Sequence, residues 1–210
     1  FLSHRWLRGD LKQPDDEENS KYKLLMYAID RMKLEGWLPD NDEEIAFWID
    51  FACCDQDREP AKELNDRMSQ MIGLCDFMLT PAVDKLWIEW AGERTTEQIL
   101  ADGHPLMSYK AEAWLVYVGR GWCRLEFWLN AYVPFRTQRA GGYGGGLGEA
   151  MMREKRRPHL LVGSREMARG ELPIVLPKLD DELYRLYHPV KGELFDQKDE
   201  IVIGLNVKHL

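Results

Sequence analysis

Short apolar runs alternate with amphipathic segments along this chain, and that alternation limits its fold more than any other feature. Residues 45–49 form a continuous apolar run, as expected of a strand covered on both faces, and residues 74–79 read as the next strand. Residues 20–35 and 61–72 show the apolar spacing of helices. Strands that alternate with helices build βα units, so the sequence predicts an α/β fold with a mostly parallel sheet.

The rest of the chain continues this alternation of strands and helices. Residues 1–3 read as the end of an opening strand, and residues 160–162 and 174–176 as two short later strands. Helices are expected over residues 111–133 and again over 196–208, where carboxylates near the start suit the helix dipole. The pattern therefore predicts helices and strands near both ends of the chain as well as in its middle.

A single domain is expected over residues 1–210, since 45% hydrophobic residues supply one sizeable core. The chain opens in the middle of a strand and without an initiator Met, which indicates a piece excised from a longer protein. Two segments depart from the βα plan. Residues 82–109 read as an insertion, and residues 139–148, with six glycines, read as a flexible loop.

Composition excludes several classes of function. Acidic residues outnumber basic ones by 36 to 28, so a nucleic-acid partner is not expected. No apolar run approaches the ~18–20 residues of a membrane span. The four cysteines, of which Cys53 and Cys54 are adjacent, do not form a disulfide framework, and this favours a reducing cytoplasmic setting. Without a C-x-x-C motif and with scattered histidines, no metal site is expected.

A carboxylate interrupts an apolar helical stripe. At about 100° per residue, six side chains of a helix that continues through Gly119 and Gly121 share one face. They are Leu115, Val118, Trp122, Glu126, Leu129 and Val133. An unpaired buried carboxylate is costly, so Glu126 must be paired, protonated or lining a polar cavity. Two interpretations stay open: a structural ion pair with an arginine such as Arg5 or Arg124, and a functional carboxylate.

Polar side chains follow the predicted strands, at the edge where open α/β sheets bind ligands. They are Ser3, His4, Arg5 and Trp6 after the first strand, Asp50 after the second and Thr80 after the third. Arg5 can grip a phosphate, Trp6 offers a stacking surface, and Asp50 can bind a ribose hydroxyl or fix Arg5. In the competing interpretation these side chains bind no ligand. Trp6 packs against the protein, Arg5 pairs with an acidic neighbour, and Asp50 caps its own loop.

Three short motifs resemble the Toll/interleukin-1 receptor (TIR) superfamily and its fungal heterokaryon-incompatibility (HET) relatives. Residues 1–6, FLSHRW, look like the opening strand and its loop. Residues 48–56, WIDFACCDQ, are similar to the HET segment in which an aromatic, an Asp, a Cys and an Asp-Gln pair follow the second strand. Residues 121–126, GWCRLE, look like the Trp-Cys-x-x-Glu helix of TIR domains. Together the motifs span residues 1 to about 130.

The resemblance implies a flavodoxin-like three-layer fold and an activity. Catalytic TIR domains cleave the nicotinamide–ribose bond of NAD⁺, by hydrolysis or with cyclisation, in immune or cell-death signalling. Their essential Glu corresponds to Glu126, with NAD⁺ as substrate rather than cofactor. Many members act only when assembled, so a homo-oligomer is expected. The residues expected around the substrate are Ser3, His4, Arg5, Trp6, Asp50 and Trp122, with Arg5 on the pyrophosphate and Trp6 or Trp122 stacked on a ring.

Two other functions compete with the enzyme. A non-catalytic TIR-type adaptor would signal by self-association, with Glu126 as a buried structural carboxylate and the loop after Asp50 as its contact surface. A nucleotide-sensing domain would bind NAD⁺ or a derivative without turnover. Release of nicotinamide, abolished by a Glu126→Gln substitution, separates the enzyme from both.

Overall fold

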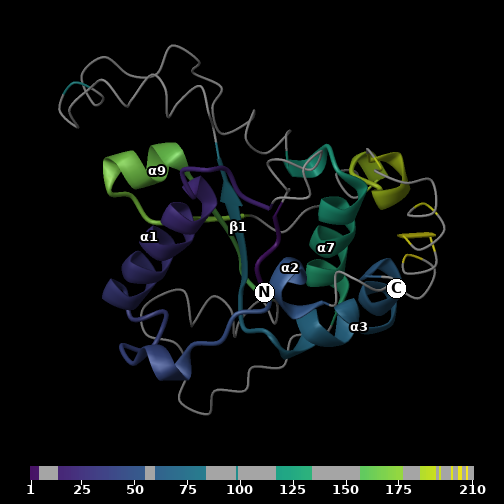
Figure 1. Cartoon of the computed structure of the whole chain (residues 1–210), viewed down its shortest axis with the longest axis horizontal. Coiled ribbons are helices and arrows are strands. Elements are labelled where there is room, and N and C mark those ends of the chain that lie inside the picture. The colour runs from purple at the N-terminus through teal and green to yellow at the C-terminus, as the bar shows by residue number, and fades with distance from the viewer. Residues whose placement is uncertain are drawn as a thin grey trace.

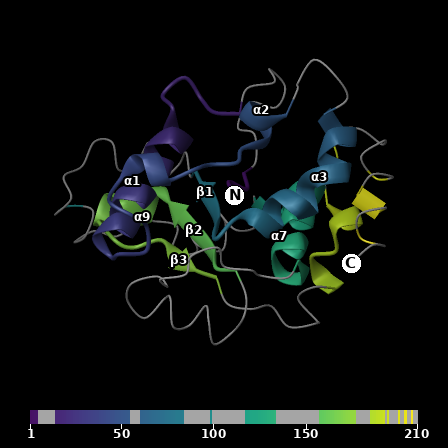
Figure 2. The same ribbon diagram turned by 90° about the horizontal axis from the view of Figure 1, so that it is seen from below.

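The computed structural model describes residues 1–4, 14–54, 60–83, 117–133, 157–176 and 185–192, with isolated positions at 98, 194, 200, 203, 204 and 207. The described part is a mixed α/β structure in which helices pack on both faces of a small sheet (Figure 1). On one face lie α1 (Ser20–Leu34) and α9 (Ser164–Arg169), and on the other α3 (Pro60–Leu74) and α7 (Gly121–Tyr132), as Figure 2 also shows.

The sheet is parallel at its centre. β1 (Met78–Ala82) pairs in parallel with β2 (His159–Gly163), and β2 pairs with the antiparallel β3 (Ile174–Val175). Leu2 forms parallel bridges with both Ile49 and Leu79. The opening segment therefore lies between β1 and the segment that ends at Ile49.

The antiparallel direction of β3 departs from the parallel sheet expected for this region. Only ten residues, 164–173, connect β2 to β3. A parallel crossover takes a dozen or more residues, so this connection is too short for one. Its helix, α9, ends at Gly170, whose φ of 64° is left-handed and suits glycine, and the chain then runs back along β2.

The run at residues 45–49 is not a strand covered on both faces. Within the described residues it pairs through the single bridge at Ile49, and Phe47 is 41% exposed. Ile45 and Ile49 pack on the α1 side of the sheet and Trp48 on the α7 side, but these three side chains are only partly buried and Ala46 is exposed. The run supplies one bridging residue, after which α2 (Asp50–Cys53) begins.

β1 lies further along the chain than predicted. The sequence placed this strand at residues 74–79 and ended it at Thr80. Instead α3 continues to Leu74, and Thr80 and Pro81 lie inside β1. Pairing with β2 along five residues overrides the tendency of proline to end a strand.

The helices follow the predicted spacing with one exception. α1 and α3 match the segments 20–35 and 61–72 to within two residues. The helix predicted at 111–133 is shorter: α7 begins at Gly121, because Arg120 is extended. Glycine is a weak helix former, so the stripe does not continue as one helix through Gly119 and Gly121. Residues 111–116, the loop at 139–148, and most of 82–109 and 196–208 lie outside the described residues.

Two apolar clusters fill the two sides of the sheet. The first joins α1 to the strands and consists of Leu2, Leu24, Leu25, Ala28, Ile29, Met32, Trp37, Phe77, Leu79, Leu160 and Val162. The second joins α3 to α7 and consists of Phe1, Met68, Ile72, Met78, Leu125, Leu129 and Ile203. Successive strand residues point to opposite faces, so Leu2 and Leu79 face α1 while Phe1 and Met78 face α7. In the described ranges, no helix has the length and apolar character of a membrane span.

Candidate functional site

A buried polar cluster lies where the opening segment leaves the sheet. Ser3, fully buried, follows the bridging residue Leu2, and its N–H donates to Leu79 O at 2.9 Å. Its hydroxyl contacts the carboxyl Oε2 of Glu126 on α7. Glu126 is 6% exposed, so the burial predicted from the helical stripe is confirmed. The structure thus brings together two candidates from opposite parts of the sequence.

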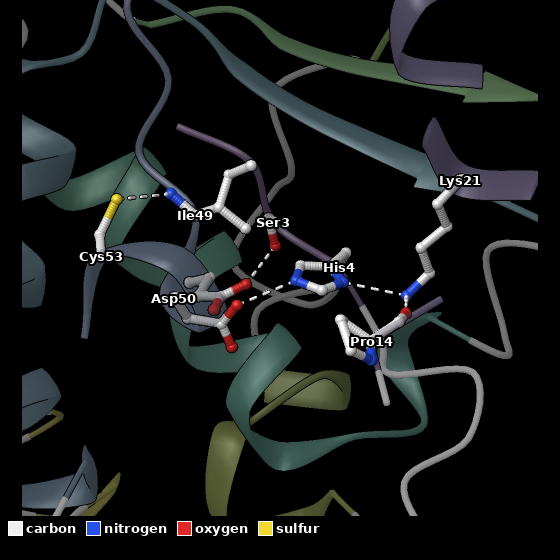
Figure 3. A network of polar contacts seen from close by, with 8 residues as sticks. Ser3, His4, Pro14, Lys21, Ile49, Asp50 and Cys53 are labelled. Atoms are coloured by element: carbon white, nitrogen blue, oxygen red, sulfur yellow. Dashed lines mark hydrogen bonds and ion pairs between the residues drawn. The ribbon is translucent and has the colours of Figure 1, made fainter. Parts of the chain in front are cut away.

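A second contact chain begins at the next residue (Figure 3). The His4 ring contacts Asp50 Oδ1 through Nε2 and Lys21 Nζ through Nδ1, each at 2.9 Å. Lys21 also donates to Pro14 O at 2.7 Å. Asp50 is held at this position because α2 begins with it: Cys53 N–H donates to Ile49 O at 2.8 Å.

Further hydroxyl groups extend the cluster into the protein. Tyr117 Oη lies 2.5 Å from Ser3 Oγ and donates to Cys123 O at 3.2 Å. Thr80 Oγ1 lies 2.8 Å from His159 Nε2. Burial raises the pKa of Tyr117 well above its ordinary value, and hydrogen bonds with Ser3 and Thr80 lower it by less. The cluster is therefore one polar network built from the opening segment, β1, β2 and the residues around α7.

Burial and a neighbouring charge control the ionisation of Glu126. Burial raises the pKa of its carboxyl well above the ordinary value, and the negative charge of Asp50 raises the pKa further. The hydrogen bond from Ser3 acts in the opposite direction and does not cancel these effects. The carboxyl of Glu126 therefore holds its proton to a higher pH than an exposed glutamate does.

Hydrogen bonds join Glu126 to the rest of the cluster. The Ser3 hydroxyl donates to Glu126 Oε2, Ser3 Oγ lies against Tyr117 Oη, and Tyr117 donates to the carbonyl of Cys123. Thr80 brings a further hydroxyl group to Tyr117. The Glu126 carboxyl therefore has its hydrogen-bond partners within the protein.

The ion pair between Glu126 and Arg124, one of the structural interpretations, is not formed. Arg124 donates instead to Val118 O at 2.5 Å and to His188 O at 3.2 Å. Those bonds tie the start of α7 to its neighbours and point the guanidinium elsewhere. Arg5, the other arginine considered, lies outside the described residues, as does Trp6.

Trp122 has a different environment from the other candidates. It is partly buried and packs against the apolar cluster between α3 and α7. Its stacking on a substrate ring stays a prediction. Among the described residues, no three His, Cys, Asp or Glu side chains lie close enough together to hold a metal ion.

Three residues of the site were missed by the sequence interpretation: Lys21, Tyr117 and His159. Lys21 lies on the buried side of α1, and its spacing to Leu25, Ala28 and Met32 was a usable signal, the same one that identified Glu126. No comparable spacing pattern in the sequence identified Tyr117. Its role depends on a contact with a residue more than a hundred positions away, and no local pattern encodes that.

Comparisons of the chain with protein-family models, with curated proteins and with solved structures find no match. A function for this protein therefore has to be inferred from the geometry of this cluster. The resemblance of three short motifs to TIR and HET domains stays an expectation from the sequence.

The raised pKa of Glu126 predicts how stability depends on pH. The native state binds this proton more tightly than the unfolded chain, so its contribution to stability is present at acidic pH and is lost as pH rises through the native pKa. The Glu126→Gln substitution removes this pH-dependent loss of stability. The variant is expected to match the wild type near pH 4.5 and to be the more stable of the two at pH 8.

Urea denaturation of both proteins at several pH values measures this difference. Glu43→Gln, at an exposed carboxylate, is the matched control and should follow the wild type throughout. Parallel curves for wild type and Glu126→Gln between pH 5 and 8 would show that Glu126 does not hold its proton in the native state.

Proposed function

We propose that this protein is a TIR-like NAD⁺ glycohydrolase in which Glu126 is the catalytic carboxylate. The observation that carries the proposal is the position of Glu126. It is a buried carboxyl joined to Ser3, directly after the opening strand segment, with Asp50 close enough to influence its ionisation. Buried acids with perturbed ionisation are a feature of catalytic sites.

The strand order supports a flavodoxin-like frame for the site. Taking the segments that end at Leu2 and Ile49 as first and second, the order across the sheet is second, first, β1, β2, β3. Flavodoxin-like sheets have this order, 2-1-3-4-5, and bind ligands at the carboxyl ends of the strands between the first and third. Ser3 lies there. The antiparallel β3 is a departure at the far edge of the sheet.

The chemistry of the reaction suits a carboxylate. Cleavage of the C1′–N bond gives its electron pair to the nicotinamide, which leaves as a neutral molecule without general acid. The ribose becomes oxocarbenium-like, and a nearby carboxylate stabilises that positive charge more strongly than it stabilises the ground state. Water then adds at C1′ and releases a proton, which yields ADP-ribose. Attack by the adenine of the same molecule gives the cyclic product instead.

The raised pKa of Glu126 in the ligand-free protein fits this scheme. A neutral acid in a buried site avoids the cost of an unpaired charge. A substrate that brings the cationic nicotinamide ring close to Glu126 favours the ionised carboxyl, because an opposite charge lowers an acid's pKa. Substrate binding and ionisation of the catalytic group are therefore coupled.

Other residues of the cluster take supporting roles in the proposal. Asp50, whose side chain is 23% exposed and contacts His4, would bind a ribose hydroxyl. Arg5 would bind the pyrophosphate, and Trp6 or Trp122 would stack on a ring. The four free cysteines support a reducing, cytoplasmic setting.

The test is release of nicotinamide from NAD⁺. The purified chain is incubated with NAD⁺ at high protein concentration, because assembly is expected to switch the activity on, and the products are separated by chromatography. Nicotinamide and ADP-ribose, or its cyclic form, should appear together. Release should rise more steeply than in proportion to protein concentration.

A non-catalytic adaptor is the second candidate, and one observation favours it. Glu126 is 6% exposed and its hydrogen-bond chain is complete within the protein, as in a structural polar network. An assembled, folded sample that binds NAD⁺ without releasing nicotinamide would indicate a sensor. One that does neither would indicate the adaptor.

A further inference from the structure

Lys21 is a buried lysine at one end of the polar cluster. It lies in the first turn of α1 and is 6% exposed. Lysines are seldom buried unless partners satisfy the ammonium group. Here two of the partners are the carbonyl of Pro14 and the ring of His4. The burial of the Lys21 ammonium group therefore requires a physical explanation.

The contacts fix the orientation of the His4 ring. An ammonium group only donates hydrogen bonds, so Nδ1 of His4 must accept the bond from Lys21. The proton of the neutral ring then lies on Nε2, which donates it to Asp50 Oδ1. Figure 3 shows Lys21, His4 and Asp50 in this sequence, with the His4 ring between the other two. Lys21 thus selects the tautomer that can hold Asp50.

Hydrogen bonds from the backbone hold Lys21 and the start of α1 in place. Its N–H donates to Asp15 Oδ1 at 3.0 Å, and the N–H of Ser20 donates to Asp16 Oδ1 at 2.9 Å. These bonds satisfy two of the free amide groups at the start of α1. α1 in turn packs on β1 and β2 through the first apolar cluster. A rigid helix end therefore presents the ammonium to His4.

We propose that Lys21 is a positioning residue: it fixes the His4 ring so that Nε2–H holds the Asp50 carboxylate beside Glu126. This inference rests on the proposed function, since it assigns a role in the same site. Exposure increases from His4 to Asp50 along the chain of contacts. The side chain of His4 is 4% exposed and that of Asp50 is 23% exposed, so Asp50 is the group that an entering substrate meets.

The test compares three variants. Lys21→Met keeps the length and apolar stem but removes the donor, and Lys21→Arg restores a donor-only group. Lys23→Met is the matched control, because Lys23 is exposed on the same helix two residues away. Displaced catalytic groups cost about 10- to 100-fold in rate. We expect kcat for nicotinamide release to fall by about that factor in Lys21→Met, to recover in part in Lys21→Arg, and to stay unchanged in Lys23→Met.

A second readout does not depend on catalysis. Nitrogen-15 NMR of the ring reports which nitrogen of His4 carries the proton. The wild type should show a protonated Nε2 and an unprotonated Nδ1, and Lys21→Met should show a mixture of tautomers. Circular dichroism shows whether each variant folds. Lys21→Gln, whose side-chain amide can donate or accept and so no longer fixes Nδ1 as an acceptor, replaces a Lys21→Met variant that does not fold.

The outcomes separate this inference from the proposed function. A wild type that releases no nicotinamide contradicts the proposed function, and the ring spectrum then still decides whether Lys21 orients His4. An active wild type whose kcat and ring spectrum are both unchanged in Lys21→Met overturns the positioning role. A fall in kcat with an unchanged ring spectrum also overturns it, because the effect would then not pass through His4.

Discussion

A Glu126→Gln variant is expected to lose nicotinamide release by about 100-fold or more in kcat while remaining folded. Loss of a single preorganised group that stabilises transition-state charge costs about this much. Glutamine has nearly the same size as glutamate, and its carbonyl oxygen accepts the hydrogen bond from Ser3. It carries no negative charge, however. The variant therefore keeps the contact and loses the interaction with the oxocarbenium-like ribose.

The measurement is steady-state release of nicotinamide over a range of NAD⁺ concentrations. Glu43→Gln makes the same chemical change at an exposed position and should leave kcat at the wild-type value. A folded Glu126→Gln variant with full activity would show that another group performs the reaction. An unfolded variant is not expected, since the loss of a buried ionisable group should raise stability at neutral pH.

Glu126 was identified from sequence because burial on a helix follows a period. A carboxylate on an apolar stripe is visible without any knowledge of the fold, and the structure confirms its burial. The same argument applied to α1 identifies Lys21, which shares a stripe with Leu25 and Ala28. What the pattern cannot provide is the partner. The contact of Glu126 with Ser3 joins positions 123 residues apart and depends on how the strands are ordered.

For the strands too, the sequence predicted segments but not their arrangement in the sheet. Leu2 and Ile49 were each assigned to a strand, and they pair with each other as parallel neighbours. The assignment of residues 45–49 to a strand covered on both faces was wrong, because hydrophobicity does not reveal whether a segment borders the sheet. The direction of β3 depends on connection length rather than on the residues of the strand. Composition and periodicity therefore predict elements better than they predict arrangement.

A Gly192→Ala variant is expected to be destabilised by about 3 kcal/mol, the upper range for overpacking. Gly192 follows η3 (Pro189–Lys191), which packs against the start of α7. A Cβ at this position would lie 2.5 Å from the Cα of Gly121 and 2.8 Å from the carbonyl carbon of Arg120. These are backbone atoms that cannot rotate away, so the two segments must separate. The φ of −81° at Gly192 is open to alanine, and the penalty therefore comes from contact alone.

Thermal unfolding measures the effect. A loss of about 3 kcal/mol lowers Tm by roughly 6–12 °C in a chain of this size. Gly204→Ala is the matched control, because nothing lies within 4 Å of a Cβ there, and a helical alanine should leave Tm unchanged or raise it. Since Glu126 lies on the helix that begins at Gly121, displacement of that helix should also reduce nicotinamide release. An unchanged Tm for Gly192→Ala would mean that η3 does not pack this closely on α7, and that the position of Glu126 is set without it.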